Sequence, residues 1–222
     1  MIATAQYVTP ERRDTLTMTS DKKEIPMVMP ADWVAGPRQG KWTYERYAAL
    51  PDDGHRYEVV QGVLMMSPAP EIAHQRVVQR ISRYLDEQIF STKRGEVLPG
   101  PTDVVLSQKK VVQPDLAVLL NQRHERLKKQ YVEGAPDLVV EVISPSTATY
   151  DRLVKYALYA ESGVSEYWLV DPAEQSIEVF VLEVGAYRSL GVFRGEQIER
   201  SQFIPNETVA AARFFDPGWK TM

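Results

Sequence analysis

The chain has 222 residues, of which 44% are hydrophobic and 25% charged, a composition that suits a globular protein with a sizeable core and argues against bulk disorder. It has no cysteine, which excludes disulfides, thiol nucleophiles and thiolate zinc sites, and its three histidines are too widely spaced to favour a multi-histidine zinc site. The net charge of −4 argues against tight, nonspecific DNA binding, although a local patch of Lys and Arg can still bind phosphates.

The hydropathy pattern gives no sign of a membrane or secreted protein. No stretch reaches the ~18 uninterrupted apolar residues of a membrane span. The N-terminus also lacks the apolar run of a secretory signal. We therefore expect a cytoplasmic protein that does not contact a membrane.

The first 41 residues show no sustained periodicity, so we expect residues 1–41 to be a flexible extension and residues 42–222 to form the ordered domain. The first expected elements are two short strands, 57–60 and 63–66. Gln61-Gly62 lies between them, and because glycine readily adopts positive φ, this spacing predicts a β-hairpin with a two-residue turn.

The next expected element is a helix over residues 71–90, whose apolar residues recur at helical spacing. Three arginines, Arg76, Arg80 and Arg83, lie on another face of this helix. We interpret them as a solvated charged face, with contact to nucleic-acid phosphates as the alternative.

A series of short apolar runs then predicts strands and one further helix. The expected strands are 103–107, 111–120, 137–143 and 166–170, followed by a hairpin of 176–182 and 187–193 around Gly185, and the expected helix is 149–162. We expect Leu153, Tyr156, Ala157 and Ala160 to form the buried stripe of that helix, with Asp151, Lys155 and Tyr159 on an adjoining face. The order indicates an α/β (α+β) fold with a mixed central sheet flanked by helices and with additional N-terminal and C-terminal β-hairpins.

Two acidic residues are conspicuous because they interrupt apolar strands: Asp115 in the 111–120 run and Glu141 in the 137–143 run. Burying a carboxylate costs several kcal/mol unless it is paired or bound to a metal. Two carboxylates on neighbouring strands can share a hard cation such as Mg²⁺. The alternative is that each is paired with a local Arg or Lys, or faces solvent. Asp137 is a poorer partner, because its Cα lies ~13 Å from that of Glu141 along one strand.

These residues, in this order of helices and strands, resemble the PD-(D/E)XK nuclease superfamily and, more narrowly, the Uma-type restriction endonucleases. The resemblance covers roughly residues 42–215. The matching residues are Tyr57-Glu58, Gly62, His74, Pro114-Asp115, the run from Pro136 to Thr147, Asp151, Lys155 and Tyr167-Trp168. It implies a restriction-endonuclease-like fold, Mg²⁺ with Mn²⁺ as a substitute, a DNA substrate and a homodimer. The metal ligands would be Asp115, Glu141 and the backbone carbonyl of Val142.

The chain departs from the superfamily pattern at one position. The lysine expected two residues after Glu141 is Ile143, which cannot polarise a phosphate. We therefore expect Lys155 to take over that role, with Asp151 holding it in place. The alternative is an ordinary exposed ion pair.

Two further residues have both a functional and a structural interpretation. Glu58 could be a third carboxylate at the metal, or a surface residue paired across the first hairpin. His74 falls in register with Val78, Ile81 and Leu85 and should be buried. It could carry protons beside the site, or be a hydrogen-bonded core histidine.

Three functions remain open at this point. The first is a Mg²⁺-dependent DNA endonuclease. The second is a catalytically silent nucleic-acid or protein binding module that retains the fold, which the net charge and Ile143 both favour. The third is a metal-dependent hydrolase that acts on a substrate other than nucleic acid.

Overall fold

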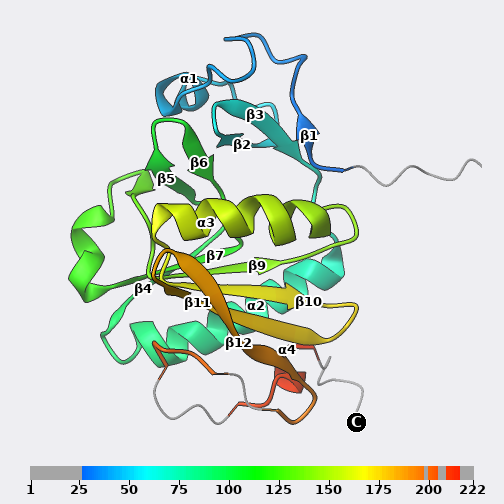
Figure 1. Ribbon diagram of the computed structural model, residues 1–222, viewed down its shortest axis with the longest axis vertical. Helices are drawn as coiled ribbons and strands as arrows, with labels where there is room; N and C mark the ends of the chain where they lie inside the picture. The colour runs from blue at the N-terminus through cyan, green and yellow to red at the C-terminus, as the bar shows by residue number, and fades with distance from the viewer. Residues whose placement is uncertain (1–26, 198–199, 205–208, 216–222) are drawn as a thin grey trace, which may run out of the picture.

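The computed structural model describes residues 27–197, 200–204 and 209–215, which form two six-stranded mixed sheets and a few helices (Figure 1). The N-terminal sheet has the order β1-β3-β2-β6-β5-β8. Its strands are β1 (Met29–Pro30), β2 (Arg56–Val60), β3 (Val63–Ser67), β5 (Asp103–Ser107), β6 (Lys110–Val112) and β8 (Tyr131–Glu133).

The central sheet has the order β12-β11-β10-β9-β7-β4, with β9 and β10 parallel and the other neighbours antiparallel. Its strands are β4 (Gly95–Pro99), β7 (Leu116–Leu120), β9 (Leu138–Val142), β10 (Glu166–Asp171), β11 (Ser176–Glu183) and β12 (Ala186–Arg194). The C-terminal hairpin predicted around Gly185 is β11–β12, and it extends this sheet.

Two helical segments cover opposite faces of the central sheet. The helices are α1 (Tyr44–Ala48), α2 (Ile72–Leu85) with the π-helical η1 (Asp86–Phe90), the 3-10 helix η2 (Asn121–Arg126), the π-helical η3 (Tyr150–Lys155) continuing as α3 (Tyr156–Ser162), and α4 (Ala212–Phe215). In Figure 1, α3 lies between the two sheets, and α2 lies on the other side of the central sheet. No helix among the described residues is long and apolar enough to cross a membrane.

The period-two pattern of the central strands explains this layering. In β9, Leu138, Val140 and Val142 pack against α2, whereas Val139 faces the α3 side. Glu141 alternates with Val140 and Val142, and it therefore points toward α3.

Two features of the sheets differ from the expectation of one central sheet with terminal hairpins. The first is that the N-terminal hairpin β2–β3 belongs to a separate sheet. The second is that residues 111–120 do not form one strand: β6 ends at Val112, and β7 begins at Leu116 in the other sheet. The break contains Pro114, which has no N–H to give to a sheet. Asp115 therefore lies at the crossing between the sheets rather than inside a strand.

Besides β1, two short strands were missed. Residues 95–99, where we expected Gly95 and Pro99 to break the chain, form β4 at the edge of the central sheet. Pro99 is tolerated there because an edge strand leaves some N–H positions unpaired. The three-residue strand β8 was also not predicted, and it pairs parallel with β5.

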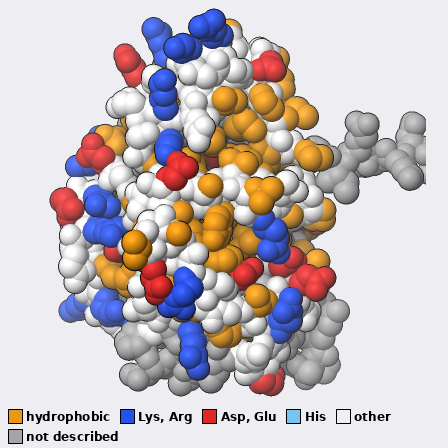
Figure 2. All heavy atoms as spheres, in the orientation of Figure 1, with side chains coloured by type: hydrophobic (Ala, Val, Ile, Leu, Met, Phe, Trp, Pro, Cys, Tyr) orange, Lys and Arg blue, Asp and Glu red, His pale blue; other side chains and the backbone are white. Residues whose placement is uncertain are grey.

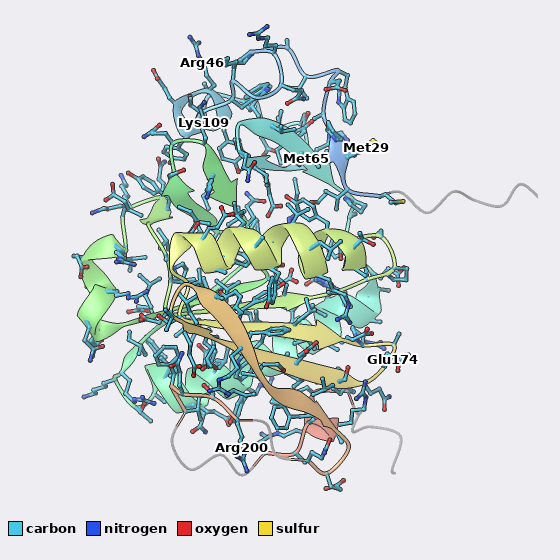
Figure 3. All side chains as sticks on the ribbon, in the orientation of Figure 1. Met29, Arg46, Met65, Lys109, Glu174 and Arg200 are labelled. Atoms are coloured by element: carbon cyan, nitrogen blue, oxygen red, sulfur yellow. The ribbon has the colours of Figure 1, made fainter. Side chains whose placement is uncertain are left out.

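The N-terminal boundary also differs from the expected one near Trp42. Residues 27–41 already pack on the domain: β1 pairs with β3, Ala31 is buried, and the Gln39 side chain accepts a hydrogen bond from the Leu64 amide at 2.8 Å. Figure 3 shows Met29 and Met65 side by side on these strands. Residues 1–26, expected to be flexible, lie outside the described residues.

The buried face of the second helix is not the predicted apolar stripe. Leu153 is 65% exposed and Ala157 is also exposed, whereas Asp151, Lys155, Leu158 and Tyr159 are buried. The prediction was wrong because hydrophobicity was used to choose the buried face, and here a cluster of one ammonium and several carboxyl groups occupies the interior.

Candidate active site

Between the two sheets lies a small cavity of about 40 Å³, enough for a few water molecules. Its walls come from parts of the chain far apart in sequence. They include Arg56, Glu58, Ser67, His74, Gln113, Asp115, Glu141, Val142, Ser144, Tyr150, Asp151 and Lys155. The carboxylates singled out from the sequence therefore share one cavity.

Asp115 is fixed by two donors. Its Oδ2 accepts hydrogen bonds from the Val142 amide at 2.8 Å and from Nε2 of His74 at 3.0 Å. Burial would raise the pKa of Asp115, but the hydrogen bond and charge of His74, together with the Val142 amide, outweigh burial and lower it. Asp115 therefore stays ionised. Among the described residues, its Oδ1 has no hydrogen-bond donor.

Glu141 is held from the α3 side. Its Oε1 accepts hydrogen bonds from the Tyr159 hydroxyl at 2.7 Å and from the Lys155 ammonium at 2.8 Å. Burial raises the pKa of Glu141 to about 8, and the carboxylates of Asp151, Asp115 and Glu58 also raise it, against the lowering effect of Lys155. In the part of the chain that the structure covers, Oε2 has no donor.

Lys155 is enclosed by carboxylates. Besides Glu141, its Nζ lies 3.0 Å from Oε1 of Glu58 and 3.9 Å from Oδ1 of Asp151. Burial would lower the pKa of Lys155, but Glu141 and Glu58 hold it well above the ordinary value, so the ammonium keeps its charge. The alternative of an ordinary exposed ion pair was wrong, because the Lys155 side chain is only 6% exposed.

Glu58 is also an interior residue, which rules out the interpretation as a surface strand residue. It is 2% exposed, its Oε1 accepts a hydrogen bond from the Gln113 amide at 2.8 Å, and its Oε2 accepts one from the Tyr150 hydroxyl at 3.1 Å. Glu58 thus joins the N-terminal sheet to the helix η3.

His74 is buried, as its register predicted. His74 lies in the first turn of α2, and its imidazole reaches Asp115, which directly precedes β7. Within the described residues its Nδ1 has no hydrogen-bond partner. His74 therefore orients Asp115, whether or not it also carries protons.

The three arginines of α2 do not reach the cavity. Arg76 and Arg83 are exposed, and Arg80 donates a hydrogen bond to the Phe214 carbonyl oxygen at 3.1 Å. Asp137, set aside at the sequence level, lies at the other end of β9, where it accepts a hydrogen bond from the Leu120 amide and pairs with Arg123.

Sequence reasoning missed Arg56 and Tyr150 at the cavity and gave Tyr159 no role. The spacing of four residues between Asp151, Lys155 and Tyr159 was a usable signal for Tyr159, because it places the three side chains on one helix face. No such signal marked Arg56, which precedes Tyr57 in an unremarkable hairpin strand.

The donor set fits a hard divalent cation. Among the described residues, Asp115 and Glu141 each keep one carboxylate oxygen without a hydrogen-bond donor, and three carboxyl groups lie 2.8 to 3.9 Å from the Lys155 ammonium. Across the described residues, no group of three or more His, Asp or Glu side chains could hold an ion by itself. Mg²⁺ is commonly held by one or two carboxylates and completed by water and substrate oxygens.

Comparison with known proteins identifies the class. Residues 44–213 match the Uma2 family, described as "Putative restriction endonuclease". Because the match spans most of the chain, this protein belongs to the Uma2 family.

Two individual proteins are similar to it. A crystal structure described as a "putative nuclease belonging to DUF820" from Anabaena variabilis ATCC 29413 has a TM-score of 0.66 and 17% identity, covering 78% of this chain and 97% of that one, which shows a shared fold. An uncharacterized protein of Synechocystis sp. is 40% identical over 68 residues. That match spans 30% of this chain and only 35% of the relative.

Proposed function

We propose that this protein is a Mg²⁺-dependent endonuclease that hydrolyses phosphodiester bonds in DNA, with Mn²⁺ able to replace Mg²⁺. The observation that carries the proposal is the pair Asp115 and Glu141, two fixed and buried carboxylates that line the same cavity, each with one oxygen that accepts no hydrogen bond from the described residues. Membership in the Uma2 family supports the reaction class.

In this proposal Asp115, Glu141 and the Val142 carbonyl hold the ion. When bound, Mg²⁺ supplies charge stabilisation at the scissile phosphate and lowers the pKa of the attacking water. The surrounding residues orient these ligands: His74 and the Val142 amide fix Asp115, and Tyr159 and Lys155 fix Glu141. Such partners of metal ligands commonly change metal affinity or activity 10–100-fold when removed.

The role proposed for Lys155 is narrower than the one expected from the sequence. The Lys155 ammonium contacts Glu141 and Glu58 and, at a longer distance, Asp151. Its positive charge therefore offsets part of their negative charge and holds Glu141 and Glu58 in position. Lys155 is thus a positioning residue in this scheme.

Incubation of the purified protein with plasmid DNA, with and without Mg²⁺ or Mn²⁺, tests the activity. Calorimetric titration with Mn²⁺ tests the metal site: we expect binding that is lost in Asp115→Asn and Glu141→Gln. Asp137→Asn is the matched control, because it alters a buried aspartate at the far end of the same strand. Equal Mn²⁺ binding by the wild type and both site variants would refute the assignment.

The catalytically silent module is the second candidate, and specific observations favour it. Ile143 replaces the usual lysine, and the Lys155 ammonium is already paired with carboxylates. If no DNA form is cleaved with either metal while Mn²⁺ still binds, this candidate or a hydrolase of another substrate replaces the first.

The homodimer implied by the family resemblance is likewise a proposal. Hydrophobic side chains gather on one face, over β1 and β3 and along η3–α3 (Figure 2). Exposed large hydrophobic residues of these elements are Met29, Leu153 and Val154. Exposed apolar surface of this kind often contacts another protein. The molar mass from light scattering decides between one copy and two.

A further inference from the structure

Arg56 is a cationic side chain at the cavity whose hydrogen-bonding capacity is only partly used. It lies on β2, two residues before Glu58 and on the same side of the strand. Its Nη2 donates a hydrogen bond to the Gln113 carbonyl oxygen at 3.0 Å. Its Nε is buried and has no acceptor among the described residues, and none of their carboxylates lies within ion-pairing distance.

This arrangement is unusual for an arginine beside an acidic cluster. Arg123, for comparison, pairs directly with the buried Asp137 at 3.1 Å. Arg56 is instead held by a backbone carbonyl, which fixes the guanidinium without neutralising it. A buried N–H donor without an acceptor costs roughly 1–3 kcal/mol, so a ligand that accepts from it is favoured.

Lys155, the other Lys or Arg at the cavity, cannot serve the same purpose. Its ammonium already contacts Glu141, Glu58 and Asp151. A phosphodiester that approaches this acidic cavity is repelled by the carboxylates, and the positive charge left to attract it comes from Arg56 and from any bound cation.

Ser67 adds a second donor beside Arg56. The two residues are directly paired between β2 and β3, and both line the cavity. Paired residues on adjacent strands have Cβ atoms roughly 4.5–5.5 Å apart. Within the described residues the Ser67 hydroxyl has no hydrogen-bond partner, so it is available to a ligand.

From these observations we infer that Arg56 and Ser67 form an anion subsite that binds a phosphate group of the nucleic-acid strand. The planar guanidinium presents paired N–H donors that match two phosphate oxygens, and the serine hydroxyl donates to the same group. This inference rests on the proposed nuclease function, and it assigns substrate binding to Arg56 rather than to the arginines of α2.

The first test measures binding without cleavage. A fluorescent single-stranded oligonucleotide is titrated with the protein in Ca²⁺ at several salt concentrations. For Arg56→Gln we expect affinity at least ~10-fold weaker and a log–log salt slope smaller in magnitude by about 0.7, as for one lost phosphate contact on a single strand. Arg56→Lys should keep the slope and recover part of the affinity, and Ser67→Ala should weaken binding while leaving the slope unchanged.

The matched control is Arg46→Gln, an exposed arginine of α1 at the outer end of the molecule, outside the cavity (Figure 3). It should change neither affinity nor slope. A purely structural role for Arg56 would lower the thermal midpoint and leave the slope unchanged. A folded Arg56→Gln variant with wild-type affinity and slope overturns the inference.

A second measurement separates this inference from the nuclease proposal. In the NMR spectrum of ¹⁵N-labelled protein, the Arg56 Nε–H signal, assigned by its loss in Arg56→Gln, should shift on addition of inorganic phosphate. If it shifts although no DNA is cleaved, the anion subsite stands and the nuclease proposal fails. If DNA is cleaved with unchanged KM and kcat in Arg56→Gln, the nuclease proposal stands and the anion subsite is overturned. The anion subsite is also overturned if inorganic phosphate does not shift the Arg56 Nε–H signal.

Discussion

Replacing Lys155 with methionine should strongly destabilise the protein. The substitution keeps most of the side-chain volume and removes the one ammonium inside the carboxylate cluster. Lys155 is 5% exposed, so water cannot take over its role without opening the interior.

The contact distances set the magnitude. At an effective dielectric constant of about 20, the contacts of 2.8 Å to Glu141 and 3.0 Å to Glu58 each correspond to roughly 5–6 kcal/mol of attraction. Desolvation offsets much of this, and removing one partner from a buried ion pair costs about 3–5 kcal/mol. For a domain of this size, that corresponds to a thermal midpoint lower by roughly 6–20 °C.

Calorimetry of Lys155→Met, Glu141→Gln and the double variant measures the effect and its origin. The double variant should be more stable than the sum of the single changes by about 1–3 kcal/mol, because the partners are in contact. A Lys155→Met variant within 1 kcal/mol of the wild type would refute the reasoning, as would strict additivity of the two changes. Cleavage measured below the midpoint of Lys155→Met should fall at least ~10-fold, the lower end of the range for a partner of a metal ligand.

Three further predictions concern other contacts. Tyr159→Phe removes the 2.7 Å hydrogen bond to Glu141, so it should lower the free energy of unfolding by about 1.5–3 kcal/mol, measured by chemical denaturation, and weaken Mn²⁺ binding. A variant with unchanged stability and Mn²⁺ affinity would show that the contact is unimportant. Gly36→Ala should lower the thermal midpoint, because the new Cβ would lie 2.5 Å from the Trp42 ring, and an unchanged midpoint would mean that residues 27–41 do not pack as described. Arg123→Ala breaks the pairing with Asp137 and should destabilise by about 1–3 kcal/mol without altering DNA binding; an unchanged unfolding free energy, or loss of DNA binding in a folded variant, would contradict this structural role.

The sequence was sufficient to locate the buried acids. Asp115 and Glu141 are 7% and 3% exposed, as expected from their apolar neighbours, and the helical register of His74 correctly placed it inside. For Glu141 and His74 the inference succeeded because burial on a strand or helix follows a local period, which neighbouring residues report directly. The roles proposed for these residues in metal binding and catalysis remain predictions.

The tertiary structure decided which side chains meet. Glu58 and Tyr150 are 92 positions apart in the chain, yet they share a hydrogen bond, and no local pattern records such a contact. Hydrophobic periodicity misplaced the buried face of η3–α3 for the same reason: Lys155 is stable inside because Glu141 of the central sheet and Glu58 of the N-terminal sheet both contact it. The charge of a residue is read from the sequence, but the cost of burying it depends on partners that only the fold brings into contact.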